Sequence, residues 1–319
     1  MYINSICSIS AAGTITDKEA LPALLSTNEN RKQCIEPDYK DLIPPMQLRR
    51  MSKPVRTGVA AAKICLGEER NLTAINIGTA YGMLQDSENF LDKMISQEEQ
   101  MLNPTAFIQS THNTVSGQIA LGIQCNAHNM TFVHKGHSVE SALLDAQLIL
   151  EQQPASQILI GAVDECTDTS FEILKQFDIY NDEVAAGEGA HFLLLSGEKK
   201  ESSIANLVAF EMFRANDIAN VELHLQTFLA NNNIAPQATD LVVLGNNGNA
   251  KDAAIYQSIT ATFFEENEIV NYKEYSGEYP TAVGFALSLA ALEVKDKYDC
   301  VWVINNFGSH WSVYCLQVV

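Results

Sequence analysis

Short apolar runs alternate with stretches of helical periodicity along most of this chain. Short apolar runs are typical of buried strands, and apolar residues spaced three and four apart are typical of helices that pack on them. This alternation predicts an α/β fold with helices on both faces of its sheets. We predict strands at 2–9, 72–78, 129–133, 157–163, 190–196, 204–213, 240–245, 299–306 and 310–319, and helices at 56–67, 112–125, 138–153, 220–232, 251–264 and 281–294.

A polar stretch, GEKKESS at 197–203, interrupts this pattern. The order of strands and helices after it is similar to the order before it. We therefore predict a duplicated α/β unit with mixed sheets, whose halves are residues 1–200 and a shorter 201–319, joined in one compact unit. The two halves share little sequence, so this prediction rests on element order.

The composition is that of a globular protein, with 46% hydrophobic and 18% charged residues. The formal net charge of −19 repels phosphate backbones and anionic lipid, which argues against nucleic-acid and membrane-surface roles. The longest nearly uncharged apolar run, TAVGFALSLAAL at 281–292, is too short to span a bilayer. No membrane insertion is expected.

Seven cysteines are scattered singly, and no CxxC pair occurs. The odd count and irregular spacing indicate reduced thiols, as in a cytoplasmic protein. The start of the chain lacks the basic region of a secretory signal. GTAYG at 78–82 is neither a P-loop nor a dinucleotide fingerprint, and no His, Cys and Asp spacing fits a metal site, so we expect no cofactor and no metal.

Four segments share the motifs of one enzyme family. They are PTAFIQSTHNTVSGQIALGIQC (104–125), SALLDAQLILEQQPASQILIGAVDE (141–165), GEGAHFLLLS (187–196), and the pair KEYSGEYPTAVGFALSLAALEV (273–294) with NNFGSHWSVYCL (305–316). In this order they resemble the helix before the nucleophile, the nucleophile helix with its strand, the GEGA strand, and the lysine and GH loop with the final turn of β-ketoacyl synthases. The resemblance implies a thiolase-like fold with layered α-β-α-β-α architecture.

Enzymes of that family need a cysteine thiolate at a helix N-terminus, where the helix dipole lowers its pKa. The matching position here is Gly136 or His137, and HKGHS at 134–138 contains no cysteine. Two histidines of the family assist decarboxylation and stabilise the enolate. Their matching positions hold Leu244 and Glu278. The resemblance therefore implies that no catalytic residue of the family remains.

Other parts of the family's site are retained. The lysine before the second histidine is present as Lys273, and the first phenylalanine of the final turn as Phe307, whereas the second position of that turn holds Ser309. A fold kept without its reaction implies a chain-length-factor-like subunit that pairs with an active ketosynthase. The stretches YINSICSIS (2–10), RRMSKPVRTG (49–58) and THN (111–113) most resemble partner subunits of aryl-polyene or flexirubin-type pathways.

Two alternatives to that function stay open. In the first, Ser138 acts as a nucleophile with His137 as its base, in an acyltransferase or hydrolase of altered mechanism. We favour a simpler interpretation, in which Ser138 is the N-cap of the helix at 138–153. In the second, the chain is a homodimer that binds an acyl group or an acyl carrier protein without reaction.

Glu278 and Lys273 could form an acid/base pair or an ion pair. A carboxylate would repel a developing enolate, so we favour the ion pair. Thr111, His112 and Asn113 lie at a helix entrance, where Asn113 could cap the helix or the triplet could contact another subunit.

Arg49, Arg50, Lys53 and Arg56 form the densest basic cluster of the acidic chain. They could dock an acidic acyl carrier protein, or serve a solvated helix face and internal salt bridges.

Overall fold

The first half of the chain builds most of one sheet and its helices. This computed structural model describes residues 1–20, 23, 29–232, 234 and 239–319. The elements up to residue 196 are β1 (Tyr2–Ser10), β2 (Gly13–Thr16), β3 (Arg31–Lys32), α1 (Pro45–Leu48), α2 (Lys53–Leu66), β4 (Ala74–Gly78), α3 (Leu84–Ser96), α4 (Pro104–Gln109), α5 (Thr114–Ile123), β5 (His128–Phe132), the 3-10 turn η1 (Lys135–His137), α6 (Ser138–Gln152), β6 (Gln157–Asp164), α7 (Asp168–Gln176), β7 (Ala186–Gly187) and β8 (Gly189–Ser196).

The second half is shorter and has fewer helices. Its elements are β9 (Ala205–Arg214), α8 (Ile218–Asn232), β10 (Leu241–Leu244), α9 (Ala250–Phe263), β11 (Glu268–Asn271), α10 (Lys273–Ser276), α11 (Val283–Asp296), β12 (Cys300–Phe307) and β13 (His310–Gln317). Every strand and helix that the sequence predicted is present, with ends that differ by a few residues.

The strand order repeats between the halves. In the described residues, one 11-stranded sheet runs β11-β10-β12-β13-β9-β1-β8-β6-β4-β5, with β2 on β1. When the short strands β2 and β3 are set aside, the third strand of each half (β5 and β11) lies at an edge of the sheet, and the strand directions also agree. β4 is parallel to β5 and β6, and β10 is parallel to β11 and β12. β8 and β13 are antiparallel to both of their neighbours. The β1–β9 pairing, Tyr2 with Asn206, joins the halves.

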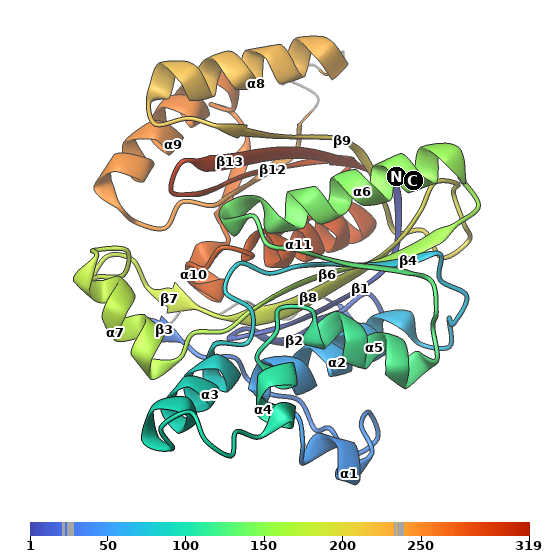
Figure 1. Cartoon of the computed structure of the whole chain (residues 1–319). Coiled ribbons are helices and arrows are strands. Elements are labelled where there is room, and N and C mark those ends of the chain that lie inside the picture. The colour runs from blue at the N-terminus through green and yellow to red at the C-terminus, as the bar shows by residue number, and fades with distance from the viewer. Residues whose placement is uncertain (21–22, 24–28, 233, 235–238) are drawn as a thin grey trace.

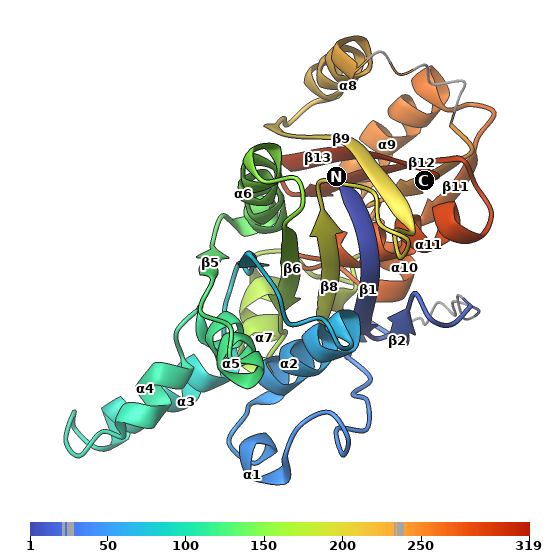
Figure 2. The ribbon, with the colours of Figure 1, turned by 90° about the vertical axis from the view of Figure 1, so that its right-hand side faces the viewer.

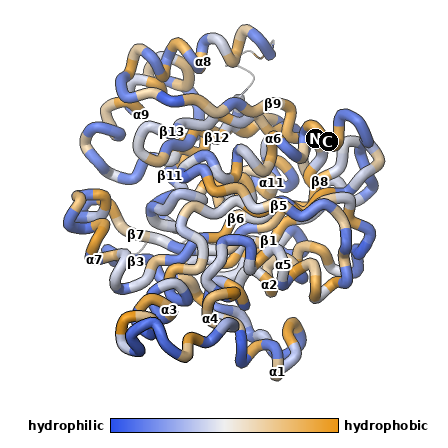
Figure 3. Tube along the Cα trace, in the orientation of Figure 1, coloured by the Kyte–Doolittle hydropathy of each residue, from blue (hydrophilic) through white to orange (hydrophobic). Residues whose placement is uncertain are grey.

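Five layers are visible in Figure 1: helices, the strands of the second half, helices, the strands of the first half, and helices. The continuous sheet thus contributes two of the layers, one from each half. One hydrophobic cluster lies under α2 and α5, and a second lies under α8 and α9 on the opposite side. The largest surrounds α6 and α11 in the middle layer, where eleven of the fourteen α11 residues are buried. Figure 3 shows the hydrophobic residues of these inner elements. The middle layer therefore places the N-termini of α6 and α11 inside the molecule.

The ends of the elements follow local chemistry. α2 starts three residues before the predicted 56, with Pro54 in its first turn, where a proline costs no hydrogen bond. It ends at Gly67, whose φ of 53° suits a residue without Cβ. Within the described part of the chain, no helix has both the length and the apolar character needed to cross a bilayer.

Candidate functional site

The N-terminus of α6 lies against the turn between β12 and β13. Gly136 of η1 is buried there. A Cβ built on Gly136 would lie 2.8 Å from the Cβ of Phe307 and 3.0 Å from the Cβ of His310. Non-bonded carbon atoms do not approach this closely, so Gly136, one of the two positions predicted to match the family's cysteine, has no room for a side chain unless its neighbours shift.

Ser138 is the first residue of α6, and its N-cap is His137. The prediction that Ser138 caps this helix is therefore wrong. Its Oγ is fully buried, donates toward Thr79 O at 3.0 Å and Lys135 O at 2.8 Å, and accepts from the His134 N–H. Ser138 thus fastens η1 and the β4 turn to the helix.

His137 is half-buried and turned toward β13. Its Nε2 lies 3.1 Å from Trp311 O, and its ring meets the His310 ring edge-on at 4.7 Å. Burial lowers the pKa of the His137 imidazole. Among the hydrogen bonds of the described residues, none joins His137 to the Ser138 hydroxyl, so the alternative Ser138–His137 nucleophile and base are not assembled.

A buried ion pair occupies the corresponding place in the second half. Lys273 Nζ lies 2.9 Å from Glu278 Oε2 and donates to Asn306 O at 2.5 Å. Asn247 Nδ2 donates to the same Glu278 oxygen at 2.7 Å. Burial raises the pKa of the Glu278 carboxyl, and Lys273 and Asn247 oppose part of that rise. The predicted ion pair is confirmed.

The position that matches the first histidine holds no polar group. Leu244 ends β10 and is buried. Three residues later the loop supplies Asn247, which was not singled out from the sequence. Glu278 and Asn247 both line two clefts, of about 470 Å³ and about 380 Å³, and Phe307 and Ser309 line the smaller one. Glu278 and Asn247 therefore border both clefts, whereas Lys273 lines only the larger one.

A further buried carboxyl was not singled out from the sequence. Glu140, in the first turn of α6, accepts a hydrogen bond from Tyr314 OH of β13 at 2.7 Å. Burial raises the pKa of Glu140 to about 7. Its Oε2 has no hydrogen-bond partner among the described residues. A glutamate within a helical pattern gives no sign of such burial, because the sequence predicts an exposed first turn.

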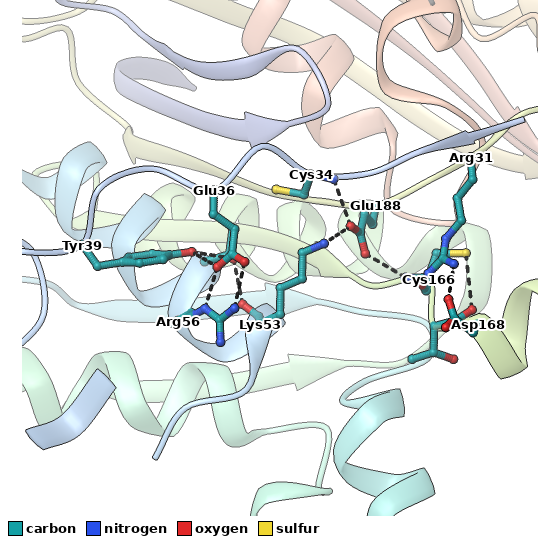
Figure 4. A network of polar contacts seen from close by, with 11 residues as sticks. Arg31, Cys34, Glu36, Tyr39, Lys53, Arg56, Cys166, Asp168 and Glu188 are labelled. Carbon is teal, nitrogen blue, oxygen red and sulfur yellow. Dashed lines mark hydrogen bonds and ion pairs between the residues drawn. The ribbon is translucent and has the colours of Figure 1, made fainter. Parts of the chain in front are cut away.

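The structure divides the basic cluster in two. Lys53 pairs with Glu188 and Arg56 with Glu36, as Figure 4 shows. Glu188 also accepts the backbone N–H groups of Cys34 and Cys166. Lys53 and Arg56 therefore fix the segment before α1 to the body of the protein. Arg49 and Arg50 are exposed, so of the four predicted docking residues these two remain open to solvent.

The predicted contact triplet lies between α4 and α5. Asn113 is the N-cap residue of α5, but its side chain makes no capping bond. Thr111 Oγ1 donates to Ile108 O at 2.9 Å. His112 is exposed, and its ring lies against Gly82, where a Cβ would approach it to 2.7 Å. The triplet thus joins α4 to the face formed by α5 and the edge strand β5.

That face carries exposed apolar side chains on three elements. β5 is the edge strand of the sheet and pairs with β4 alone. Its Met130 is 43% exposed. Further exposed apolar residues are Leu121 of α5, Val133 after β5, and Leu144 and Leu148 of α6. An unpaired strand edge beside apolar side chains is a surface built to be covered.

The sequence matches the family described as "Beta-ketoacyl synthase, N-terminal domain" over residues 25–213. This match spans more than half of the chain, and the chain belongs to the β-ketoacyl synthase family. No curated protein matches it.

Solved structures resemble the whole chain. "The ishigamide ketosynthase/chain length factor" matches with a TM-score of 0.81, 14% identity and coverage of 100% of this chain and 99% of that chain. A ketosynthase in complex with its chain length factor from Xenorhabdus doucetiae matches with a TM-score of 0.77 and 14% identity, over 100% of this chain and 98% of that chain. A type II polyketide acyl-carrier protein in complex with its ketosynthase matches with a TM-score of 0.78 and 13% identity, over 100% of this chain and 99% of that chain. At such identities the likeness shows the fold, and the predicted thiolase-like α/β architecture is confirmed.

Proposed function

We propose that this chain is a non-catalytic β-ketoacyl synthase homologue that acts as the chain length factor of an active ketosynthase. The observation that carries the proposal is the close packing at Gly136, one of the two positions predicted to match the nucleophile: Phe307 and His310 occupy the space a Gly136 side chain would need. The buried Lys273–Glu278 pair adds support, because a carboxylate in place of the second histidine opposes enolate formation. Two of the similar solved structures are ketosynthase and chain-length-factor complexes.

The heterodimer would form through β5 and its neighbours. Pairing of two edge strands satisfies their free backbone groups, and the exposed apolar residues of α5, β5 and α6 would be buried in the same contact. The partner's active site would then lie beside residues of this chain.

The segment 104–133 would wall part of the partner's acyl tunnel. Phe107 and Ile108 of α4 are exposed and precede Thr111, His112 and Asn113. A bulky side chain that closes the tunnel shortens the product, and a smaller one lengthens it. Replacement of Phe107 by alanine is therefore expected to lengthen the product, whereas alanine at Leu223, exposed on α8, serves as a control.

An acyl carrier protein is the second partner that we propose. Carrier proteins present acidic surfaces, and the exposed Arg49 and Arg50 offer positive charge in a chain of net charge −19. The stretches at 2–10, 49–58 and 111–113 support an aryl-polyene or flexirubin-type pathway in the cytoplasm. Product analysis of the reconstituted pathway tests that assignment.

Native mass spectrometry of the chain purified from its own host tests the proposal. A one-to-one complex with a cysteine-bearing ketosynthase is expected, without acyl adducts on this chain. The ketosynthase should then give different product lengths with and without it. Identical product lengths would rule out the chain-length role. A homodimer without synthase would favour the stand-alone acyl-binding alternative instead.

A further inference from the structure

Two helices, α3 and α4, project from the body of the protein as an arm, which we define as residues 84–109. Figure 2 shows the arm extending away from the sheets on the side of β5. No residue of either helix is buried. None of the arm's side chains belongs to the four hydrophobic clusters of the described residues. Little in the isolated chain therefore stabilises these helices.

The arm is fixed to the body at its base. The Gln85 N–H donates to Glu165 Oε1, Ser52 Oγ donates to Asp86, and Thr167 Oγ1 donates to Glu88. Beyond this base the helices touch each other, with Phe90 and Phe107 rings 5.5 Å apart. The base fixes the direction of the arm, whereas its far end is exposed.

That far end carries large apolar side chains. Ile95 is 76% exposed and Met101 is 97% exposed, and Leu91 lies one turn before Ile95 on α3. Helices of this length gain most of their stability from burying an apolar face, so an arm with this composition indicates a surface that something else covers.

The charged residues at the far end of the arm indicate what kind of surface could cover it. Asp92, Glu98 and Glu99 are exposed among the apolar residues, and Lys93 is the basic residue of this stretch. An acidic rim is repelled by anionic lipid and by an acidic carrier protein. A second copy of the chain, with its own net charge of −19, is a poor match as well. A protein surface with an apolar centre and a basic rim fits.

We infer that the far end of the arm, residues 91–101, clasps the ketosynthase partner on an apolar surface edged by lysine or arginine. This inference rests on the proposed function and extends the contact beyond the 104–133 segment. The arm leads through α4 into Thr111–Asn113 and α5, so it is continuous with the β5 face.

Hydrogen–deuterium exchange of the full chain, alone and in its ketosynthase complex, tests the inference. Amides at 91–101 should exchange quickly in the free chain and at least tenfold more slowly in the complex. α9, the helix that connects the corresponding strands of the second half and buries Ile255, Tyr256 and Ile259, is the control and should not change. Unchanged exchange at 91–101 together with slowed exchange in β5 overturns the inference alone. Absence of any complex overturns the proposed function as well.

A double variant adds a second readout. Ile95→Glu with Met101→Glu should weaken the complex at least tenfold, with the free chain still folded by circular dichroism. Leu223→Glu, on exposed α8, should leave affinity unchanged. Protection of the arm by phosphatidylcholine vesicles, or by self-association of the free chain at high concentration, would overturn the inference in favour of lipid or a second copy.

Discussion

The two halves of the molecule share one strand order but differ in what connects the strands. Between β4 and β5 the first half has α3, α4 and α5, whereas between β10 and β11 the second half has α9 alone. The first half therefore carries the arm and the exposed β5 face. The second half carries the buried Lys273–Glu278 pair. We propose that the division lies near residue 200.

If the proposed function holds, this difference suggests how a duplicated fold can lose a reaction and keep a role. The polar groups of the second half, Lys273 and Glu278, are buried in an ion pair and hydrogen bonds, which stabilise the fold. The apolar surface of the other half stays available for a partner. Each half can then be tested separately, by stability in the second and by complex formation in the first.

The largest effect is expected at the buried ion pair. Lys273→Met leaves the Glu278 carboxylate buried without its cation, which costs about 3–5 kcal/mol of unfolding free energy. Urea unfolding at pH 7 measures this loss. Lys273→Met with Glu278→Leu should restore most of it, because an apolar pair leaves no uncompensated charge. If both variants lose equally, the pair itself stabilises the second half.

The stability contributed by the Glu140–Tyr314 contact between the halves should depend on pH. The folded pKa of Glu140 is raised to about 7 from an ordinary 4.5, so the neutral carboxyl is the form that suits the fold. The stability it contributes is complete below pH 4.5 and is lost as pH rises to about 7, a change of about 3 kcal/mol.

Glu140→Gln keeps the acceptor for Tyr314 OH and removes the titration. The difference in unfolding free energy between the native chain and Glu140→Gln should therefore change by about 3 kcal/mol between pH 4.5 and 7. Taking the difference cancels other groups, such as Glu165, whose pKa burial raises to about 8. A difference that stays constant with pH would contradict the raised pKa.

A substitution on the β5 face should weaken binding of the ketosynthase and leave the stability of the free chain unchanged. Met130→Glu places a charge on the exposed edge strand, and we expect the ketosynthase complex to weaken at least tenfold, about 1.4 kcal/mol, with unchanged stability of the free chain. Analytical ultracentrifugation measures the dissociation constant. Glu268→Lys on β11, the edge strand of the other half, should have no effect. Equal effects at both edges would remove the assignment of the interface to the first half.

The sequence predicted nine strands and six helices because their apolar patterns are strong, and it missed the short strands β2, β3, β7 and β11 and the helix α7. It missed α3 and α4, which bury no residue, although the apolar residues of α3 (Leu91, Met94, Ile95) lie at helical spacing. Lys273 and Glu278 lie five residues apart, so their pairing could be proposed. Asn247 comes from a loop 31 residues before Glu278, and no local pattern connects the two. The contact of Phe307 with Gly136 likewise depends on the packing of both halves.

The close packing at Gly136 gives the last prediction, and it is the most direct check on the proposed loss of catalysis. Gly136→Ala must displace Phe307 or His310 and should cost about 1–3 kcal/mol of stability. Gly117→Ala is the control, because a Cβ on this α5 glycine meets nothing within 4 Å, and alanine there should be neutral or stabilising by about 1 kcal/mol.

The substitution Gly136→Cys tests whether a cysteine at this position can act as a nucleophile. The thiol would enter a space already occupied, so we expect the same loss of stability, slow alkylation by iodoacetamide and no acyl transfer from an acyl thioester. A stable, rapidly alkylated Gly136→Cys chain would mean that the turn after β12 moves aside easily. In that case the site of the first half would be dormant rather than closed, and the missing cysteine alone would explain the absence of a nucleophile.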